Sequence, residues 1–338
     1  MQIKNKTYEP YISYIPQDNF LFSILDEKKI EDFILENYLD IYSIKIDRCY
    51  DYIYRFSNFY ASVTQSKNFK FDIINYETIK QNNINIIEFI KKKILDNYCL
   101  LVSVDISKID VYKKDEIIYH EVMIFGFNDN SNEFYIKDFF DGDIYKESKC
   151  SFTEMEEAFS SFSKKEHSSF GGIICLKIND SENINNKTID LKKILYMLKN
   201  FMAYKLNDNE EKNYGFSIFY TFIKQLEMEQ VDYAPFNFIL DKLCFIRAHI
   251  MLMKVRINSL LYISEVLNNY LEKINELINK ITITINKTIK CMIKNNCYII
   301  KRDLFIREEI NEIINDYKIV INNFINVIEK NIEVINGK

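Results

Sequence analysis

The chain has 338 residues, of which 48% are hydrophobic and 28% are charged, and it contains only 6 glycines and 3 prolines. This composition is typical of a folded protein and excludes a mostly disordered one, and the length is sufficient for two domains with separate cores. The formal net charge of -5 gives no electrostatic support for a nucleic-acid partner.

The cysteines predict neither a metal centre nor a disulfide framework. No pair has C-x-x-C spacing, so we expect no zinc site and no bound cofactor, and several cysteines fall in apolar runs that are typical of a reduced core. Residues 1–10 contain no apolar signal segment, and no apolar run reaches the ~18 residues of a membrane helix. We therefore expect a cytoplasmic protein without membrane association.

Residues 1–180 alternate between helix and strand patterns that predict an α+β domain. Asp18 or Asn19 would suit the N-cap of a first helix, and Thr153 with Glu156 has the spacing of a capping box. Apolar periodicity predicts helices at 17–25, 28–39, 85–95 and 153–162, and strands at 42–46, 98–104 and 172–178.

Residues 119–140 predict a β-hairpin with two candidate catalytic side chains. Two runs rich in β-branched and aromatic residues flank the small polar loop at 128–132. His120 opens the first strand and Asp138 closes the second, so a turn near Asp129 brings the two side chains level. A carboxylate in that place can orient an imidazole and stabilise its charged form, which would give a general base with its orienting group.

The polar run at 179–183 predicts a linker, and residues 186–338 predict an all-α helical bundle. We expect helices at 189–205, 214–227, 236–259, 262–294 and 304–335. The last two carry apolar residues at steps of three and four, which predict seams of bundle packing. Residues 281–285 alternate Ile and Thr as in a strand, but their long helical surroundings favour a helix.

The first half resembles the papain-like cysteine peptidases, in particular the peptidases that process bacteriocin leaders. In that superfamily a Gln-Asp-Cys motif opens a buried helix, a His begins a later strand, and an Asp or Asn follows. Gln17, Asp18 and Asn19 match the first motif, with Ser23 and Leu25 continuing it, and His120 and Asp138 match the base and its orienter. The resemblance implies a papain-like α+β domain.

The whole chain resembles more closely the butirosin biosynthesis protein H-like group, found in antibiotic and nonribosomal peptide gene clusters. The likeness rests on the segments 120–126, 137–142, 214–215 and 246–250. It implies an acyltransferase that forms an amide between an acyl group, held on the phosphopantetheine arm of an acyl or peptidyl carrier protein, and a small amine. A homo-oligomer is compatible with the sequence.

The chain departs from this family at the nucleophile, because Asn19 stands where a Cys is expected. Ser23, one helical turn later, fits buried packing better than a substitute nucleophile. Cys49 is an alternative nucleophile, with an inert buried thiol as the simpler interpretation. His249 lies in a predicted helix beside Arg247, Lys254 and Arg256, whose charges would either meet an acidic carrier protein or cover apolar surface.

Three functions follow from these observations. The first is direct amide formation, in which His120 deprotonates the amine, Asp138 orients His120 and Asn19 donates to the developing oxyanion. The second is a catalytically inactive binding, scaffold or self-resistance protein of the same fold. The third is a cysteine peptidase that uses Cys49.

Overall fold

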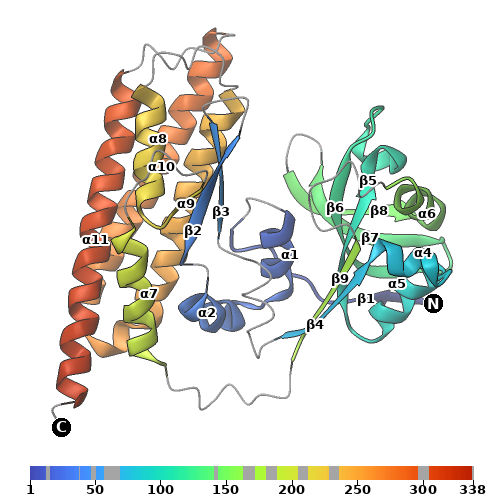
Figure 1. The fold of residues 1–338 in the computed structure, drawn as a ribbon, viewed down its shortest axis with the longest axis horizontal. Coiled ribbons are helices and arrows are strands. Elements are labelled where there is room, and N and C mark those ends of the chain that lie inside the picture. The colour runs from blue at the N-terminus through green and yellow to red at the C-terminus, as the bar shows by residue number, and fades with distance from the viewer. Residues whose placement is uncertain are drawn as a thin grey trace. The chain divides into compact units, whose positions relative to one another are not determined.

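The computed structural model describes most of the chain and shows an α+β protein with an antiparallel sheet (Figure 1). The residues that it describes are 1–12, 16–37, 39–46, 51–56, 69–140, 144–162, 172–179, 189–204, 212–227, 236–295 and 304–336. The chain forms two compact units: Met1–Ile30 with Phe59–Asn185, and Glu31–Asn58 with Asn186–Lys338. Residues 31–58, which we predicted to belong to the first domain, therefore group with the second unit.

The first unit contains an antiparallel sheet in which β6 lies between β5 and β7. The strand order is β4-β9-β5-β6-β7-β8, and β1 pairs with the far end of β6. The predicted strands at 98–104 and 172–178 and the predicted hairpin are all confirmed. The bounds are β1 Gln2–Lys4, β4 Phe69–Asn75, β5 Cys99–Asp105, β6 Tyr119–Asn128, β7 Glu133–Phe140, β8 Ile144–Ser151 and β9 Gly172–Ile178.

Helices lie on both faces of this sheet. Figure 1 shows α1 (Pro16–Ile24) on one side of it, and α4 (Tyr76–Gln81), α5 (Ile86–Leu95) and α6 (Phe152–Ser160) on the other. The capping box of α6 is formed by Ser151 and Glu154, two residues before the predicted pair, and each side chain accepts a hydrogen bond from the other residue's backbone N–H.

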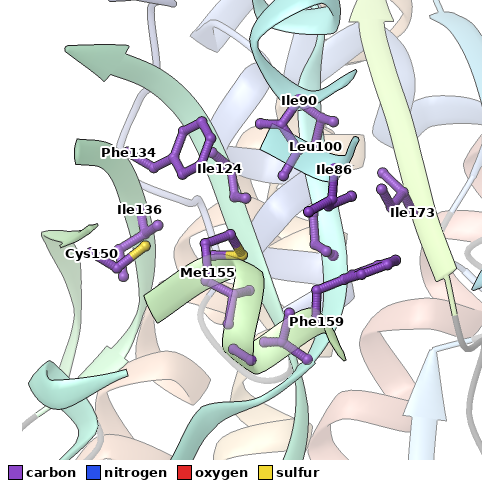
Figure 2. Close-up of a cluster of buried hydrophobic side chains, with 14 of the residues drawn as sticks. Ile86, Ile90, Leu100, Ile124, Phe134, Ile136, Cys150, Met155, Phe159 and Ile173 are labelled. Atoms are coloured by element: carbon purple, nitrogen blue, oxygen red, sulfur yellow. The ribbon is translucent and has the colours of Figure 1, made fainter. Parts of the chain in front are cut away.

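The core of the first unit lies between the sheet and helices α5 and α6. Figure 2 shows Ile86 and Ile90 of α5 and Met155 and Phe159 of α6 among side chains of the central strands. Burial of these apolar side chains fixes which face of each strand turns toward α5 and α6. On β5, β6 and β7 that face carries Leu100, Val102, Val104, Val122, Ile124, Phe134, Ile136 and Phe140.

The second unit is mostly helical, but the prediction of an all-α bundle is wrong because the unit also contains a small sheet. Strands β10, β2 and β3 pair antiparallel, and β10 supplies three residues from the helical half of the sequence. The bounds are α2 Glu27–Glu36 (which crosses the division between the units), β2 Ile41–Ile46, β3 Asp51–Phe56, α7 Leu191–Ala203, β10 Lys212–Tyr214, α8 Ser217–Glu227, α9 Phe236–Ser259, α10 Leu267–Asn295 and α11 Leu304–Asn336.

The predicted seams of the last two helices are confirmed for most of their residues, but Ile263 lies in the 3₁₀ turn Leu261–Ile263 before α10, and Tyr270 and Val327 are only half-buried. Residues 281–285 are helical within α10, so the Ile and Thr alternation does not form a strand. The buried side chains of the two seams are Leu267, Ile274, Leu277 and Ile281 on α10, and Ile306, Ile310, Ile313, Tyr317, Val320 and Phe324 on α11. None of the described helices has both the length and the apolar character that crossing a membrane requires.

Candidate functional site

The hairpin of β6 and β7 positions the two predicted catalytic side chains. The strands pair from Asn128 with Glu133 back to Met123 with Lys137, with a β-bulge between Ile124 and Gly126. Gly126 is required here, because a Cβ at this position would lie 2.6 Å from the carbonyl oxygen of Ile3 in β1. The bulge and the tight β1 contact together fix the register that carries the pair.

His120 and Asp138 are in contact, which confirms the predicted geometry. The imidazole Nε2 lies 3.4 Å from Oδ1 and 3.2 Å from Oδ2 of Asp138. The His120 side chain is 30% exposed, whereas that of Asp138 is 1% exposed. Nε2 therefore faces the buried carboxylate, and Nδ1 is the ring nitrogen that can accept a proton from a substrate.

Tyr112 is a third member of this group, and the sequence did not reveal it. It lies in the 3₁₀ turn Asp110–Tyr112, and its hydroxyl donates a short hydrogen bond to Oδ2 of Asp138. Its ring packs on Phe140, with the centroids 4.9 Å apart. Burial, together with the charge of Asp138, raises the pKa of Tyr112 well above its ordinary value, so the phenol stays a donor. The Asp138 carboxylate thus contacts the Tyr112 hydroxyl and the His120 imidazole.

Nearby negative charge raises the pKa of His120. Burial opposes the charged imidazolium, but the hydrogen bond to Asp138 and the negative charges of Asp138 and Glu121 outweigh it, so the pKa of His120 lies above its ordinary value. A base with a raised pKa holds an abstracted proton more firmly. The arrangement Tyr112–Asp138–His120 can therefore take up a proton at Nδ1 and stabilise the resulting cation.

Asn19 lies on the other face of the sheet. Side chains alternate along β7, so Lys137 and Phe139 face away from Asp138. Lys137 Nζ donates to the carbonyl of Tyr8 at 2.8 Å, and the Tyr8 N–H donates to the carbonyl of Ser23 in α1. Helix α1 therefore covers the face opposite the one that carries Asp138.

Asn19 is fully buried within α1, and the described contacts of His120 are with Asp138. The predicted trio is therefore brought together only in part, and an oxyanion donor role for Asn19 at His120 has no geometric support. Ser23 is also fully buried, and its hydroxyl donates to the Tyr145 hydroxyl at 3.4 Å, as expected of a packing residue.

The thiols of Cys99, Cys150, Cys175 and Cys244 have raised pKa values, which disfavours a thiolate at these four positions. Burial raises the pKa of the Cys99 and Cys175 thiols to about 12 and raises that of Cys150 as well. Cys244, on α9, also has a raised pKa because of burial and then the nearby Asp241. Cys49, the alternative nucleophile of the sequence, lies outside the described residues, so its role stays a prediction.

His249 is a structural residue at the centre of the second unit. Its side chain is fully buried, with Nε2 2.9 Å from the Leu39 carbonyl oxygen and Nδ1 2.8 Å from the Tyr317 hydroxyl. Because a carbonyl only accepts, Nε2 carries the proton. Burial lowers the pKa of His249 to about 3, against the opposing effect of the Leu39 hydrogen bond, so the ring is neutral.

The basic residues beside His249 are only partly available to a partner. Arg256 is 1% exposed and donates to the Asn37 carbonyl, which places it inside the unit. Arg247 is half-buried and donates to the Thr282 hydroxyl at 3.1 Å. A docking surface built on Arg256 is therefore excluded.

No protein-family model matches the sequence, and no curated protein matches it significantly. Within the described part of the chain, no group of three or more His, Cys, Asp or Glu side chains is arranged to hold a metal ion.

Proposed function

We propose that the first unit is a papain-like acyltransferase that forms an amide between a carrier-bound acyl thioester and a small amine. The observation that carries the proposal is the chain of contacts from Tyr112 through Asp138 to His120. It holds one half-exposed imidazole with its Nδ1 free for a substrate and its Nε2 fixed on a buried carboxylate. This is the arrangement that a general base needs.

The proposed step is direct transfer. The amine nitrogen attacks the thioester carbonyl, the C–N bond forms and the C–S bond breaks, and the phosphopantetheine thiolate leaves. Nδ1 of His120 takes the proton of the attacking amine and returns it to the thiolate. A thioester is already activated, so the protein need only position the partners and supply the base. The protonated thiols at Cys99, Cys150 and Cys175 favour this route over an acyl-enzyme within the described residues.

A second candidate is a catalytically inactive protein of the same fold, with a binding, scaffold or self-resistance role. The burial of Asn19 on the face opposite Asp138 favours it, because an amide is not a nucleophile and the described contacts of His120 do not include Asn19. A peptidase that uses Cys49 is the third alternative carried from the sequence.

The test measures amide formation from an acyl N-acetylcysteamine thioester, which mimics the end of the phosphopantetheine arm, and a panel of small primary amines. We expect His120→Gln to lose about 10²–10⁴-fold in rate, the usual contribution of a general base. Asn19→Ser is the matched control, and its rate constant should stay near that of the wild type.

Two results decide among the alternatives. An acyl adduct on the wild-type protein that disappears in Cys49→Ala, detected by intact-mass spectrometry, would replace direct transfer with a covalent cysteine mechanism. No product with any amine, from thioester or from acyl-loaded carrier protein, combined with equal carrier binding by wild type and His120→Gln, would favour the inactive protein.

A further inference from the structure

A pocket of about 410 Å³ lies in the first unit near the end of β5 that is remote from His120. His120 pairs with Val104, and the pocket reaches Cys99 at the start of the same strand, which is roughly 17 Å away at the rise of a β-strand. The volume falls in the range of small-molecule sites, ~300–1,000 Å³. Its lining residues are Asn5, Lys6, Ile24, Lys70, Asn97, Cys99, Leu176, Lys177, Ile178 and Asn179.

The charged residues of this lining are all lysines. Lys6, Lys70 and Lys177 contribute three positive charges, and no Asp or Glu is among the lining residues. Lys70 and Lys177 are directly opposite each other on β4 and β9, a placement that is unfavourable for like charges. Across the described residues, none of the three forms an ion pair with a carboxylate, so this charge is not neutralised from within.

Part of the lining is held in place. Lys177 Nζ donates to the Asp96 carbonyl at 2.9 Å and lies 4.4 Å from the centre of the Tyr98 ring. The Asn5 amide donates to the Tyr98 carbonyl at 2.9 Å. Lys6 and Lys70 are exposed side chains on the same pocket. Lys6 Nζ in turn lies 4.8 Å from the centre of the Tyr8 ring, so the pocket combines two ammonium groups that make a described contact with one, that of Lys70, that makes none.

We propose that this pocket binds a small phosphorylated molecule, with the ammonium groups of Lys6, Lys70 and Lys177 on its phosphate oxygens. Ammonium to phosphate contacts are charge-assisted hydrogen bonds, and an anion would relieve the repulsion between Lys70 and Lys177. The volume exceeds that of a single phosphate and leaves room for a second phosphate or an organic group. The site is independent of the proposed acyl transfer, because it lies at the other end of β5.

The probe is inorganic pyrophosphate, titrated into the full chain by calorimetry at low ionic strength. We expect saturable binding by the wild type, weakened roughly tenfold or more in Lys70→Gln/Lys177→Gln, because each charge-assisted hydrogen bond has a sizeable free energy. Lys108→Gln/Lys114→Gln removes the same charge from exposed lysines outside the pocket and should bind like the wild type. Circular dichroism checks that each variant is folded.

A second measurement does not depend on variants. Acetylation of the native protein, read by mass spectrometry, should slow at Lys6 and Lys70 when pyrophosphate is present and stay unchanged at Lys108 and Lys114. Absence of saturable binding by the wild type would overturn the proposal. Equal weakening in both double variants, or equal protection of all four lysines, would show general charge attraction and would also overturn it.

Discussion

Tyr112→Phe removes one hydroxyl from the buried end of the candidate site and keeps the ring that packs on Phe140. Tyr112 is 9% exposed and Asp138 is 1% exposed, so water replaces the lost donor poorly. A hydrogen bond to a charged acceptor is worth about 1.5–3 kcal/mol, and we expect the opening free energy of the hairpin to fall by that amount. Since two units need not unfold together, the measurement must be local.

Hydrogen exchange read by mass spectrometry on peptides from 119–140 provides that local measurement. The expected loss corresponds to exchange that is roughly ten- to a hundredfold faster in Tyr112→Phe. Tyr135→Phe is the matched control on the same strand β7, because its hydroxyl only accepts an exposed bond from Gln2. Its effect should stay within about 0.5 kcal/mol. If the two variants exchange alike, Tyr112 does not hold Asp138.

The same variant makes a signed prediction for His120. Without the phenol, the Asp138 carboxylate has one fewer donor on its charge and should attract the imidazolium more strongly. The pKa of His120 should therefore rise further, which NMR titration can follow because the chain has only 3 histidines. His120→Gln assigns the signal. A fall in the pKa of His120 in Tyr112→Phe would refute the reasoning.

Three further predictions follow from the charges and packing. In Asp138→Asn the pKa of His120 should fall, because burial lowers it and the carboxylate that raises it is gone; NMR titration would show this. In the wild type, the His120 and Asp138 pair stabilises the fold below about pH 6.5, and this stability is lost as the pH rises through the pKa of His120 in the folded protein, which pH-dependent unfolding would show. Because the pKa of His249 is lowered to about 3, the free energy of unfolding of the second unit should fall by up to about 5 kcal/mol as the pH falls from 6.5 toward 3. In unfolding experiments, His249→Gln should make this free energy less dependent on pH. Gly126→Ala should lower the free energy of unfolding by about 1–3 kcal/mol, because the added Cβ would push the Ile3 carbonyl, and with it strand β1, away from β6; hydrogen exchange at residues 2–4 should then be faster.

The hairpin and most helices could be predicted because their signals are local. The polar loop between two β-branched runs specifies the turn, and the apolar steps of α10 and α11 specify their seams. In the second unit the strand predicted at 42–46 is confirmed as β2, but its partners in the sheet could not be predicted in this way. Its strand β10 has three residues and pairs with β2 across about 170 positions of sequence, where Tyr214 meets Tyr42. Short strands gain their stability from such partners rather than from their own pattern.

In the candidate site too, contacts within one local segment could be predicted and contacts between distant segments could not. His120 and Asp138 are linked by one hairpin, so their contact follows from spacing alone. Tyr112 reaches Asp138 from a 3₁₀ turn that carries no signal for this contact. The placement of Asn19 depends on which sheet face α1 covers, and strand alternation fixes this only when the register and the covering helix are known.

The raised pKa of His120 and the raised thiol pKa values of Cys99, Cys150, Cys175 and Cys244 restrict the chemistry together. A base at Nδ1 can remove a proton, but by itself it does not make a poor electrophile reactive, and hydrolysis of a peptide amide by this pair would need an activated nucleophile as well. An acyl thioester is itself a reactive electrophile, because its thiolate is a good leaving group. The geometry around His120 therefore fits a reaction in which the donor arrives activated, and Cys49→Ala is the variant that separates this reading from a nucleophile outside the described residues.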